Sequence, residues 1–378
     1  MTLWSNDSVI LFCSSRYCLS IIRASRGRNF AAGHPCGKNV NFSCPAVSFK
    51  YIILLFCLGC NRKRQKAQKT FPHICPHVLI GVDVCVIMVL CMKMKGTVKY
   101  MSDIFSLCAF ADEATPAVDG QIRALTENGI GLIELRGVDG KNVAELTASE
   151  ARELHRRFDG SGIAVWSIGS PAGKSNIRDD FGKARDEFAR IAETAEIMGA
   201  RCIRMFSFYG ADESSACFDE ICRRIDIFGE LARGSGALLC HENEKKIYGD
   251  TPSRCRRLLD ALPDIHAVFD PANFVQCHSD PLEAWQLLSD RVFYAHIKDA
   301  TADGANVPAG QGVGRLPELI PLFREAGIKV LTLEPHLTHF TGLSALEGGA
   351  EHKTGCLHFA DGREAFDYAV GALRHLLA

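Results

Sequence analysis

The chain has 378 residues with 43 basic and 44 acidic side chains, a formal net charge of −1. Residues 1–100 hold 14 Lys and Arg against two acids, which leaves 29 basic and 42 acidic residues, a formal charge of −13, for residues 101–378. Such an acidic part lacks the basic surface that nucleic-acid binding requires, so we expect no nucleic-acid partner. The length suffices for one large α/β barrel with an appendage or for two domains.

Residues 1–100 show no steady helical or strand period. Cys57 and Cys60 form a CxxC motif, but the second CxxC of a zinc ribbon is missing. The apolar runs 51–60 and 78–92 are shorter than the ~20 residues of a membrane span, so we expect no membrane segment. This part is predicted to be a poorly structured N-terminal extension or the product of a start codon assigned too far upstream.

From Met101 onward the composition changes abruptly, and the chain runs straight into an apolar segment, as at a natural start. The first hundred residues hold 9 of the 17 cysteines, and the other eight are scattered. Scattered cysteines are typical of reduced thiols, which predicts a cytoplasmic enzyme. We therefore expect residues 101–378 to form the folded part.

Strand-like and helix-like runs alternate strictly through this part. Eight apolar runs predict strands at 104–110, 131–136, 162–168, 201–206, 237–242, 265–270, 292–296 and 328–334. Eight amphipathic runs predict helices at 118–128, 147–158, 177–198, 214–233, 251–261, 281–288, 316–326 and 363–377. This order favours a closed parallel (β/α)8 barrel, a TIM barrel, over an open sheet. No glycine-rich dinucleotide or phosphate-binding motif follows a strand.

The last four strands each end on a side chain that can bind a metal ion: Glu242, Asp270, His296 and Glu334. The active site of such a barrel lies at the carboxyl ends of its strands, so these side chains are expected to converge. Taken singly, each acid at a strand end is usually a helix cap or part of a loop ion pair, and a single histidine usually has a structural role. Together they predict one divalent ion, with Mn²⁺ preferred and Mg²⁺, Co²⁺ or Zn²⁺ as alternatives.

Other polar residues near the strand ends are candidates for binding substrate: Glu134, Arg136, Lys174, Arg204, Lys245 and Asn273. Lys298 and Asp299 could support the metal site, and His241 should point to the opposite face of its strand from Glu242. A metal ion here could hold two neighbouring oxygens of a sugar and stabilise an enediolate. Glu242 and Glu334, facing each other across the site, could remove and return the proton as the catalytic pair.

Five motifs carry a family resemblance: His241–Glu244, Phe269–Phe274, Ala295–Asp299, Val307–Gly312 and Leu333–His336. They resemble the sugar phosphate isomerase/epimerase family of xylose isomerase-like TIM barrels over about residues 103–378. The resemblance implies that Glu242, Asp270, His296 and Glu334 bind a divalent ion, often Mn²⁺. It also implies that the two Glu transfer protons, as in the ketose 3-epimerases. Those epimerases carry a His three residues after the metal-binding Asp, where this chain has Asn273.

We interpret the chain as a metal-dependent isomerase or epimerase of a sugar, sugar phosphate or related polyol or keto compound. A dehydratase of the inosose type is an alternative within the same superfamily. A phosphodiester hydrolase like the apurinic endonucleases is disfavoured, because their three-zinc site needs His on early strands and strands two to four here have none. A catalytically silent sugar-binding barrel is disfavoured by the complete ligand set. A homo-oligomer is possible.

Overall fold

The computed structural model describes residues 105–343 and 353–378, together with five short strands between residues 3 and 42. The chain divides into two compact units, Met1–Thr97 and Val98–Ala378. The first contains an antiparallel sheet of β1 (Leu3–Ser5), β2 (Ser8–Ser15), β3 (Cys18–Ala24), β4 (Phe30–Ala32) and β5 (Val40–Phe42). The CxxC motif, the two apolar runs and the expected start at Met101 lie outside the described residues.

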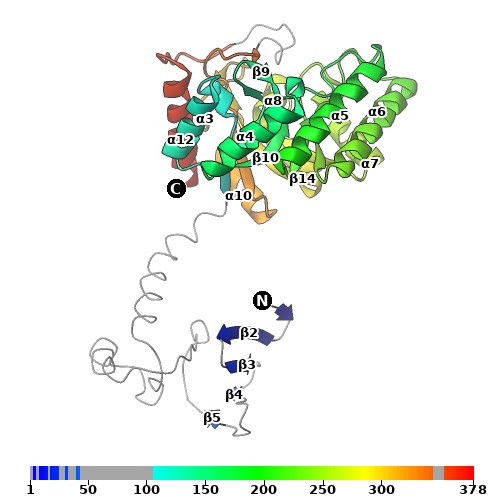
Figure 1. Cartoon of the computed structure of the whole chain (residues 1–378). Coiled ribbons are helices and arrows are strands. Elements are labelled where there is room, and N and C mark those ends of the chain that lie inside the picture. Colours follow the sequence, from blue (N-terminus) through cyan, green and yellow to red (C-terminus); the bar gives the residue numbers. More distant parts are fainter. Residues whose placement is uncertain are drawn as a thin grey trace. The chain divides into compact units, whose positions relative to one another are not determined.

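Eight parallel strands of the second unit close into a barrel (Figure 1). In chain order they are β6 (Ser106–Ala109), β7 (Leu132–Leu135), β10 (Ala164–Gly169), β11 (Cys202–Met205), β12 (Leu238–Glu242), β13 (His266–Phe269), β14 (Val292–Ile297) and β17 (Val330–Leu333). The barrel closes where β17 pairs with β6, with Leu331 opposite Leu107. All eight predicted strands are present, and the predicted TIM barrel is confirmed.

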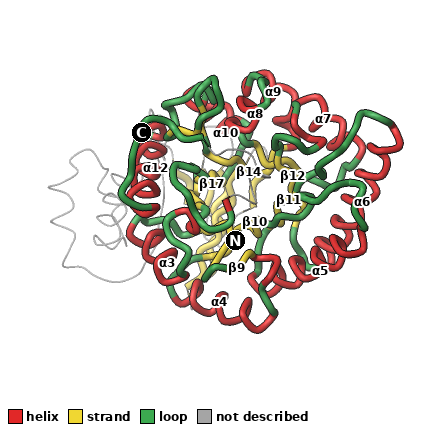
Figure 2. The backbone as a smooth tube through the Cα atoms, turned by 90° about the horizontal axis from the view of Figure 1, so that it is seen from above, coloured by secondary structure: helices red, strands yellow, loops and turns green. Residues whose placement is uncertain are grey.

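Helices form a ring outside the strands (Figure 2). They are α3 (Val118–Glu127), α4 (Ala148–Gly160), α5 (Phe181–Met198), α6 (Ser215–Gly234), α7 (Pro252–Ala261), α8 (Pro271–Gln276), α9 (Pro281–Leu288), α10 (Leu316–Glu325) and α12 (Gly362–Leu377). The short α8 was not predicted. The third helix begins at Phe181 rather than Ile177, because the Asp180 side chain caps it by accepting from the Gly182 N–H. Among the described residues, no helix combines the length and apolarity needed to cross a bilayer.

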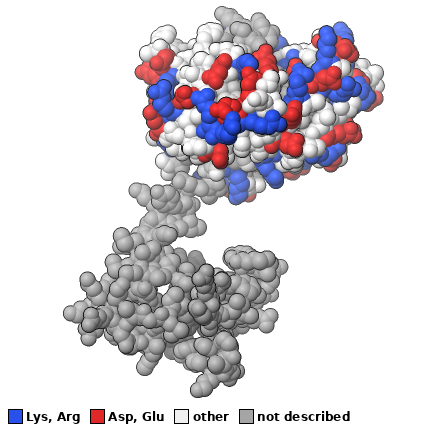
Figure 3. All heavy atoms as spheres, viewed as in Figure 1, with Lys and Arg blue, Asp and Glu red and all other residues white. Residues whose placement is uncertain are grey.

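Short turns of 3₁₀ helix join several elements: η3 (Ala111–Glu113), η4 (Val143–Glu145), η5 (Tyr248–Asp250) and η6 (Ser289–Arg291). On the face shown in Figure 3, basic and acidic side chains are interspersed over the outer helices. Arg223 and Glu220 on α6, for example, form an ion pair of 2.7 Å between Nε and Oε2. Exposed pairs of this kind contribute little to stability, so the fold depends on its core.

Two hairpins project from the carboxyl ends of the strands and shape the mouth. They are β8 (Gly137–Val138) with β9 (Lys141–Asn142), and β15 (Asp299–Ala300) with β16 (Asn306–Val307). The Asp299 carboxylate accepts backbone N–H bonds of 2.8, 3.0 and 2.8 Å from Gly310, Gly312 and Gly314. A Cβ on Gly312 would lie 2.3 Å from the Ala300 carbonyl oxygen. Asp299 therefore fixes the glycine-rich loop against the barrel.

Side-chain alternation along the strands places the site. Cys240, Val268 and Tyr294 belong to a buried cluster of inward-facing residues, apart from the larger core under the helices. Residues two positions further on point the same way, one layer nearer the mouth. Glu242 and His296 follow from this rule at the ends of their strands.

Candidate active site

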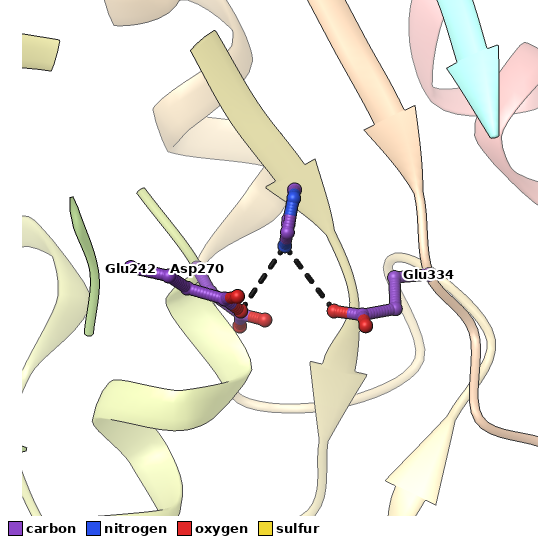
Figure 4. A group of neighbouring side chains, drawn as sticks. Glu242, Asp270 and Glu334 are labelled. Atoms are coloured by element: carbon purple, nitrogen blue, oxygen red, sulfur yellow. Dashed lines mark hydrogen bonds and ion pairs between the residues drawn. The ribbon is translucent and has the colours of Figure 1, made fainter. Parts of the chain in front are cut away.

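Four side chains at the ends of neighbouring strands meet inside the mouth of the barrel (Figure 4). Glu242 ends β12, His296 lies in β14, and Asp270 and Glu334 directly follow β13 and β17. One ligand atom from each lies within 4.8 Å of the other three, and all four residues are buried. The structure thus brings together the four side chains that we selected from the sequence.

Each carboxylate in this group has one oxygen bound by the chain itself. Asp270 Oδ1 accepts the backbone N–H three residues further on at 2.9 Å and so caps α8. Glu242 Oε2 accepts from Arg204 Nη1 at 2.6 Å, and Glu334 Oε1 accepts from Arg136 Nη1 at 2.8 Å. The second oxygens contact side chains within or beside the group: those of Glu242 and Glu334 contact His296, and that of Asp270 contacts Lys298.

The His296 ring lies between carboxylates on both of its nitrogen sides. Its Nδ1 is 3.1 Å from Glu242 Oε1 and 3.2 Å from Glu334 Oε2. Its Nε2 is 3.2 Å from Glu134 Oε2, and Tyr294 donates its hydroxyl to Glu134 Oε1 at 2.8 Å. Burial disfavours a charged ring, but the three carboxylates outweigh it and raise the pKa of His296. Nδ1 thus faces the centre of the group, while Nε2 faces Glu134.

The donor atoms suit a divalent cation. Three carboxylate oxygens and one imidazole nitrogen form a mixed ligand set for Mn²⁺, Mg²⁺, Co²⁺ or Zn²⁺. Asp270 Oδ2 is buried and accepts no hydrogen bond from the described residues, and its charge is met by the Lys298 ammonium alone. Lys298 Nζ lies 3.0 Å from this oxygen and 3.5 Å from Glu334 Oε2, as an ion pair at the edge of the group. Burial raises the pKa of Asp270 to about 6, although Lys298 opposes this shift.

Glu134, which we expected to bind substrate, has both oxygens bound within the chain. Besides His296 and Tyr294, it accepts from the Ser167 hydroxyl at 3.3 Å. Its side chain is fully buried. Its contacts therefore lie with the ring of a candidate metal ligand.

Arg136, another expected substrate ligand, is saturated by carboxylates. Its Nε and Nη2 donate to the two oxygens of Asp112 at 2.9 and 3.0 Å, and Nη2 also donates to Glu113 at 3.2 Å. Nη1 holds Glu334, as described above, and the guanidinium lies 4.3 Å from the centre of the Phe110 ring. With 3% of its surface exposed, Arg136 is a buried clamp on Glu334.

Arg204 is equally buried but has donors to spare. Nη1 binds Glu242, and the guanidinium carbon lies 4.7 and 5.4 Å from the centres of the Phe206 and Phe110 rings. Its Nε and Nη2 are buried without a hydrogen-bond partner among the described residues. Of the two arginines at the site, Arg204 is the one that can still bind a ligand.

The two expected lysines lie beside this group. Lys174 Nζ is 3.3 Å from Glu244 Oε2 and 4.3 Å from the centre of the Phe206 ring, and burial lowers its pKa. Lys245 donates to Gln276 Oε1 at 3.1 Å and remains partly exposed. Lys174 and Arg204 thus lie against the same aromatic ring.

Asn273 and His241 lie on different sides of the strand that ends at Glu242. Asn273 Nδ2 donates to Glu242 Oε1 at 3.2 Å and to the Asn243 carbonyl at 2.9 Å, and its Oδ1 has no partner. The His241 ring points away from the site, with Nε2 3.0 Å from Ser207 Oγ. Burial lowers the pKa of His241 to about 4.

Three residues that we did not select complete the site: Asp112, Glu113 and His336. Asp112 and Glu113 follow the first strand in η3, and Glu113 accepts the His336 backbone N–H at 2.7 Å. Burial raises the pKa of Glu113 to about 8, against the effect of Arg136. In the sequence, the one feature that pointed to Asp112 and Glu113 was their position directly after the first predicted strand.

Glu113, Glu334 and His336 also lie within ligand distance of one another. His336 Nε2 is 3.5 Å from Glu113 Oε1 and 3.4 Å from Glu334 Oε1. Arg136 donates to both carboxylates, so this second group already holds a cation.

A cavity of about 310 Å³ opens beside the site. Its lining includes Arg136 and Lys174 from the mouth, and Lys141 and Asn142 from the β8–β9 hairpin. It offers room for a small polar molecule next to the residues that hold Glu334.

A comparison with protein families finds a match. The model of the family described as xylose isomerase-like TIM barrel matches residues 122–357. A search of the curated proteins finds no match.

Three solved structures with the same fold carry a known or probable activity or a bound metal. One is the probable 3-DHS dehydratase AsbF from Bacillus anthracis, at 18% identity and a TM-score of 0.56, covering 71% of this chain and 98% of that one. Another is D-psicose 3-epimerase with D-tagatose from Clostridium cellulolyticum H10, at 13% identity and a TM-score of 0.58, covering 72% of this chain and 99% of that one. The third is a xylose isomerase-like TIM barrel protein from Mycobacterium smegmatis in complex with magnesium. It has 18% identity and a TM-score of 0.52, covering 72% of this chain and 97% of that one.

Proposed function

We infer that this chain, which belongs to the xylose isomerase-like TIM barrel family, is a divalent-metal-dependent isomerase or epimerase. The substrate class is a sugar, sugar phosphate or related polyol or keto compound. One observation carries the proposal: two buried glutamates, Glu242 and Glu334, lie on opposite sides of His296 with one oxygen each turned to a common centre. Two such carboxylates can exchange a proton with carbon from two sides.

Glu242, Asp270, His296 and Glu334 would hold the ion. When bound, a divalent ion polarises a substrate carbonyl and stabilises the enediolate that forms when a neighbouring carbon loses its proton. Mn²⁺ is our preferred ion, and the magnesium complex of the M. smegmatis structure supports Mg²⁺ as an alternative.

The chain keeps both glutamates in the ionised form, which can accept a proton. Burial alone would raise the pKa of Glu242, but His296 and Arg204 outweigh it and bring the pKa below its usual range. The pKa of Glu334 is also lowered, because Lys298 and the neighbouring histidines outweigh its burial. Both side chains are therefore ionised at neutral pH. Arg204 and Arg136 each fix the outer oxygen, so the inner oxygen keeps a defined direction.

Other residues take supporting roles in this proposal. Glu134 accepts from His296 Nε2 and so presents Nδ1 to the site, which makes Glu134 a positioning residue. Substrate oxygens would be bound by Arg204, Lys174 and Asn273 near the centre, with Lys245 at the edge.

A dehydratase is the second candidate, and Glu113 favours it. With a pKa of about 8, this buried side chain is a neutral acid at pH 7, and Arg136 connects it to Glu334. Expelling a hydroxyl group requires a proton donor of this kind. The similar B. anthracis protein is a probable dehydratase, which supports testing this reaction alongside isomerisation.

Exchange of carbon-bound hydrogen with D₂O tests the main proposal. The full chain with Mn²⁺ should catalyse exchange next to the carbonyl of at least one compound in a panel of ketoses, ketose phosphates and keto acids, followed by NMR. Glu242→Gln and Glu334→Gln should each lower the rate by about 10²-fold or more, since positioned acid–base groups contribute about 10²–10⁴-fold. Glu325→Gln, at an exposed position of α10, is the control. Loss of water without exchange would indicate the dehydratase, and neither reaction across the panel would contradict both.

We also propose that the protein functions in the cytoplasm. The eight cysteines within residues 105–343 and 353–378 are free thiols, and four are buried. Free thiols are typical of a reducing compartment. Fractionation of cells that express the native gene would test this, and recovery outside the cytoplasm would contradict it.

A further inference from the structure

The two arginines at the site bind their glutamates in the same way but differ on their other edge. Nη1 of Arg136 donates to Glu334, and Nη1 of Arg204 donates to Glu242. The Nε and Nη2 groups of Arg136 form a fork on the two oxygens of Asp112, at 2.9 and 3.0 Å. The same fork of Arg204 has no hydrogen-bond partner among the described residues, although only 1% of the residue is exposed.

A buried guanidinium edge without an acceptor costs free energy, so a ligand that fills it is stabilised. The rings near Arg204 do not meet this need. Phe206 and Phe110 contact the guanidinium through their ring faces, which attract its charge but do not replace hydrogen-bond acceptors.

A second cation, Lys174, lies near this fork, beside the carboxylates that also surround it. Lys174 contacts the same Phe206 ring at 4.3 Å and lines the cavity of about 310 Å³. Gly169 packs close to the fork, because a Cβ there would lie 3.2 Å from Arg204 Nη2 and 2.6 Å from Phe110 Cε1. Any larger residue at this position would crowd the unpaired edge of Arg204.

We propose that the Nε–Nη2 fork of Arg204 binds an anionic group of the substrate that presents two oxygens, a carboxylate or a phosphate. Two parallel N–H donors match two oxygens of such a group, as Arg136 and Asp112 demonstrate within the same site. The proposal rests on the proposed function and narrows its substrate class to acidic sugar derivatives.

The position of the fork also places the anionic group on the substrate. The guanidinium of Arg204 touches Glu242, one of the two proposed proton-transfer residues. A group bound on the adjacent edge therefore lies close to the carbon from which Glu242 takes a proton. A carboxylate attached near the reacting carbon meets this geometry with fewer intervening atoms than a phosphate on a terminal carbon.

Matched pairs of compounds test the proposal by binding, independently of turnover. The full chain loaded with Mn²⁺ is titrated by calorimetry with D-gluconate and D-glucitol, which differ in one terminal group, and with D-glucose 6-phosphate and D-glucose. Wild type should bind at least one anion about 10-fold or more tightly than its neutral partner, equivalent to about 1.4 kcal/mol. Preference within the first pair indicates a carboxylate, and preference within the second indicates a phosphate.

Arg204→Lys keeps a positive charge and a donor for Glu242 but removes the fork, so the preference should fall to about 3-fold or less. Arg136→Lys is the matched control, because its fork is filled by Asp112 and its loss should leave the preference unchanged. Mn²⁺ content and the unfolding midpoint show whether each variant is folded.

Three results would overturn the proposal: no preference for either anion in wild type, no binding of either anion, or a preference that survives in folded Arg204→Lys. Failure of the proposed function looks different. If wild type binds the anion more tightly than its neutral partner but catalyses neither hydrogen exchange nor dehydration, the binding role of Arg204 is supported and the proposed reaction is contradicted. If a neutral ketose exchanges hydrogen but neither anion binds more tightly than its neutral partner, the proposed reaction is supported and the binding role of Arg204 is contradicted.

Discussion

Replacement of Glu134 by Gln changes one atom in contact with the His296 ring. Glu134 Oε2 is 3.2 Å from His296 Nε2, and Oε1 accepts the Tyr294 hydroxyl at 2.8 Å. The substitution keeps the shape of the side chain but removes its charge. The ring then loses the charged acceptor that fixes its orientation and makes Nδ1 a better ligand.

The expected effect is on metal affinity. Loss of a partner that orients a ligand typically weakens metal binding 10–100-fold, so Glu134→Gln should raise the Kd for Mn²⁺ by about 10–100-fold, or about 1.4–2.7 kcal/mol. The fully buried position of Glu134 places the effect in the upper half of this range, because solvent does not screen the interaction.

Mn²⁺ titration of the full chain by calorimetry measures this effect. Tyr294→Phe is the control, because it removes a hydrogen bond to Oε1 of the same carboxylate and leaves the contact of Oε2 with His296 intact. Its Kd should rise by less than that of Glu134→Gln. A Kd for Glu134→Gln within about 3-fold of wild type would refute the reasoning.

Three further predictions concern stability and charge. Arg136→Met leaves the buried carboxylates of Asp112 and Glu334 without this cation, so it should destabilise the fold by about 3–5 kcal/mol in urea unfolding. Arg136→Lys should be less affected, and a loss of stability below about 1 kcal/mol in Arg136→Met would contradict the role of Arg136 as a clamp. In the folded chain the pKa of His241 is about 4, so the unfolded chain binds this proton first as the pH falls. Between pH 6.5 and 4 the free energy of unfolding of wild type should therefore fall by about 3 kcal/mol more than that of His241→Gln. Equal losses in the two proteins would contradict a buried neutral ring. Lys298→Met removes the charge that competes for Asp270 Oδ2, so it should bind Mn²⁺ more tightly in a titration, and weaker binding would contradict this.

The barrel and its four convergent side chains could be predicted because their signals are local. Each strand is an apolar run, and a parallel barrel places every strand end at the same mouth. Alternation along a strand also settled that Glu242 points into the site while His241 points away. These conclusions need no knowledge of which residues touch across the barrel.

The contacts that decide each side chain's role could not be read in this way. Glu134 lies in β7 and Arg136 directly follows it, yet Glu134 contacts His296 and Arg136 contacts Glu334, at separations in sequence of 162 and 198 residues. Glu113 reaches the site from a 3₁₀ turn, which has no periodic pattern to place it. Such partners depend on how the barrel closes, so sequence pattern alone leaves them open.

Metal analysis of the purified full chain tests the central claim most directly. Wild type should contain or bind about one divalent ion per chain, and the ion should raise the unfolding temperature. Glu334→Gln should weaken that binding and reduce the stabilisation. If wild type binds none of Mn²⁺, Mg²⁺, Co²⁺ or Zn²⁺ and gains no stability from them, the four strand-end side chains do not form a metal site, and the proposed isomerase or epimerase is contradicted.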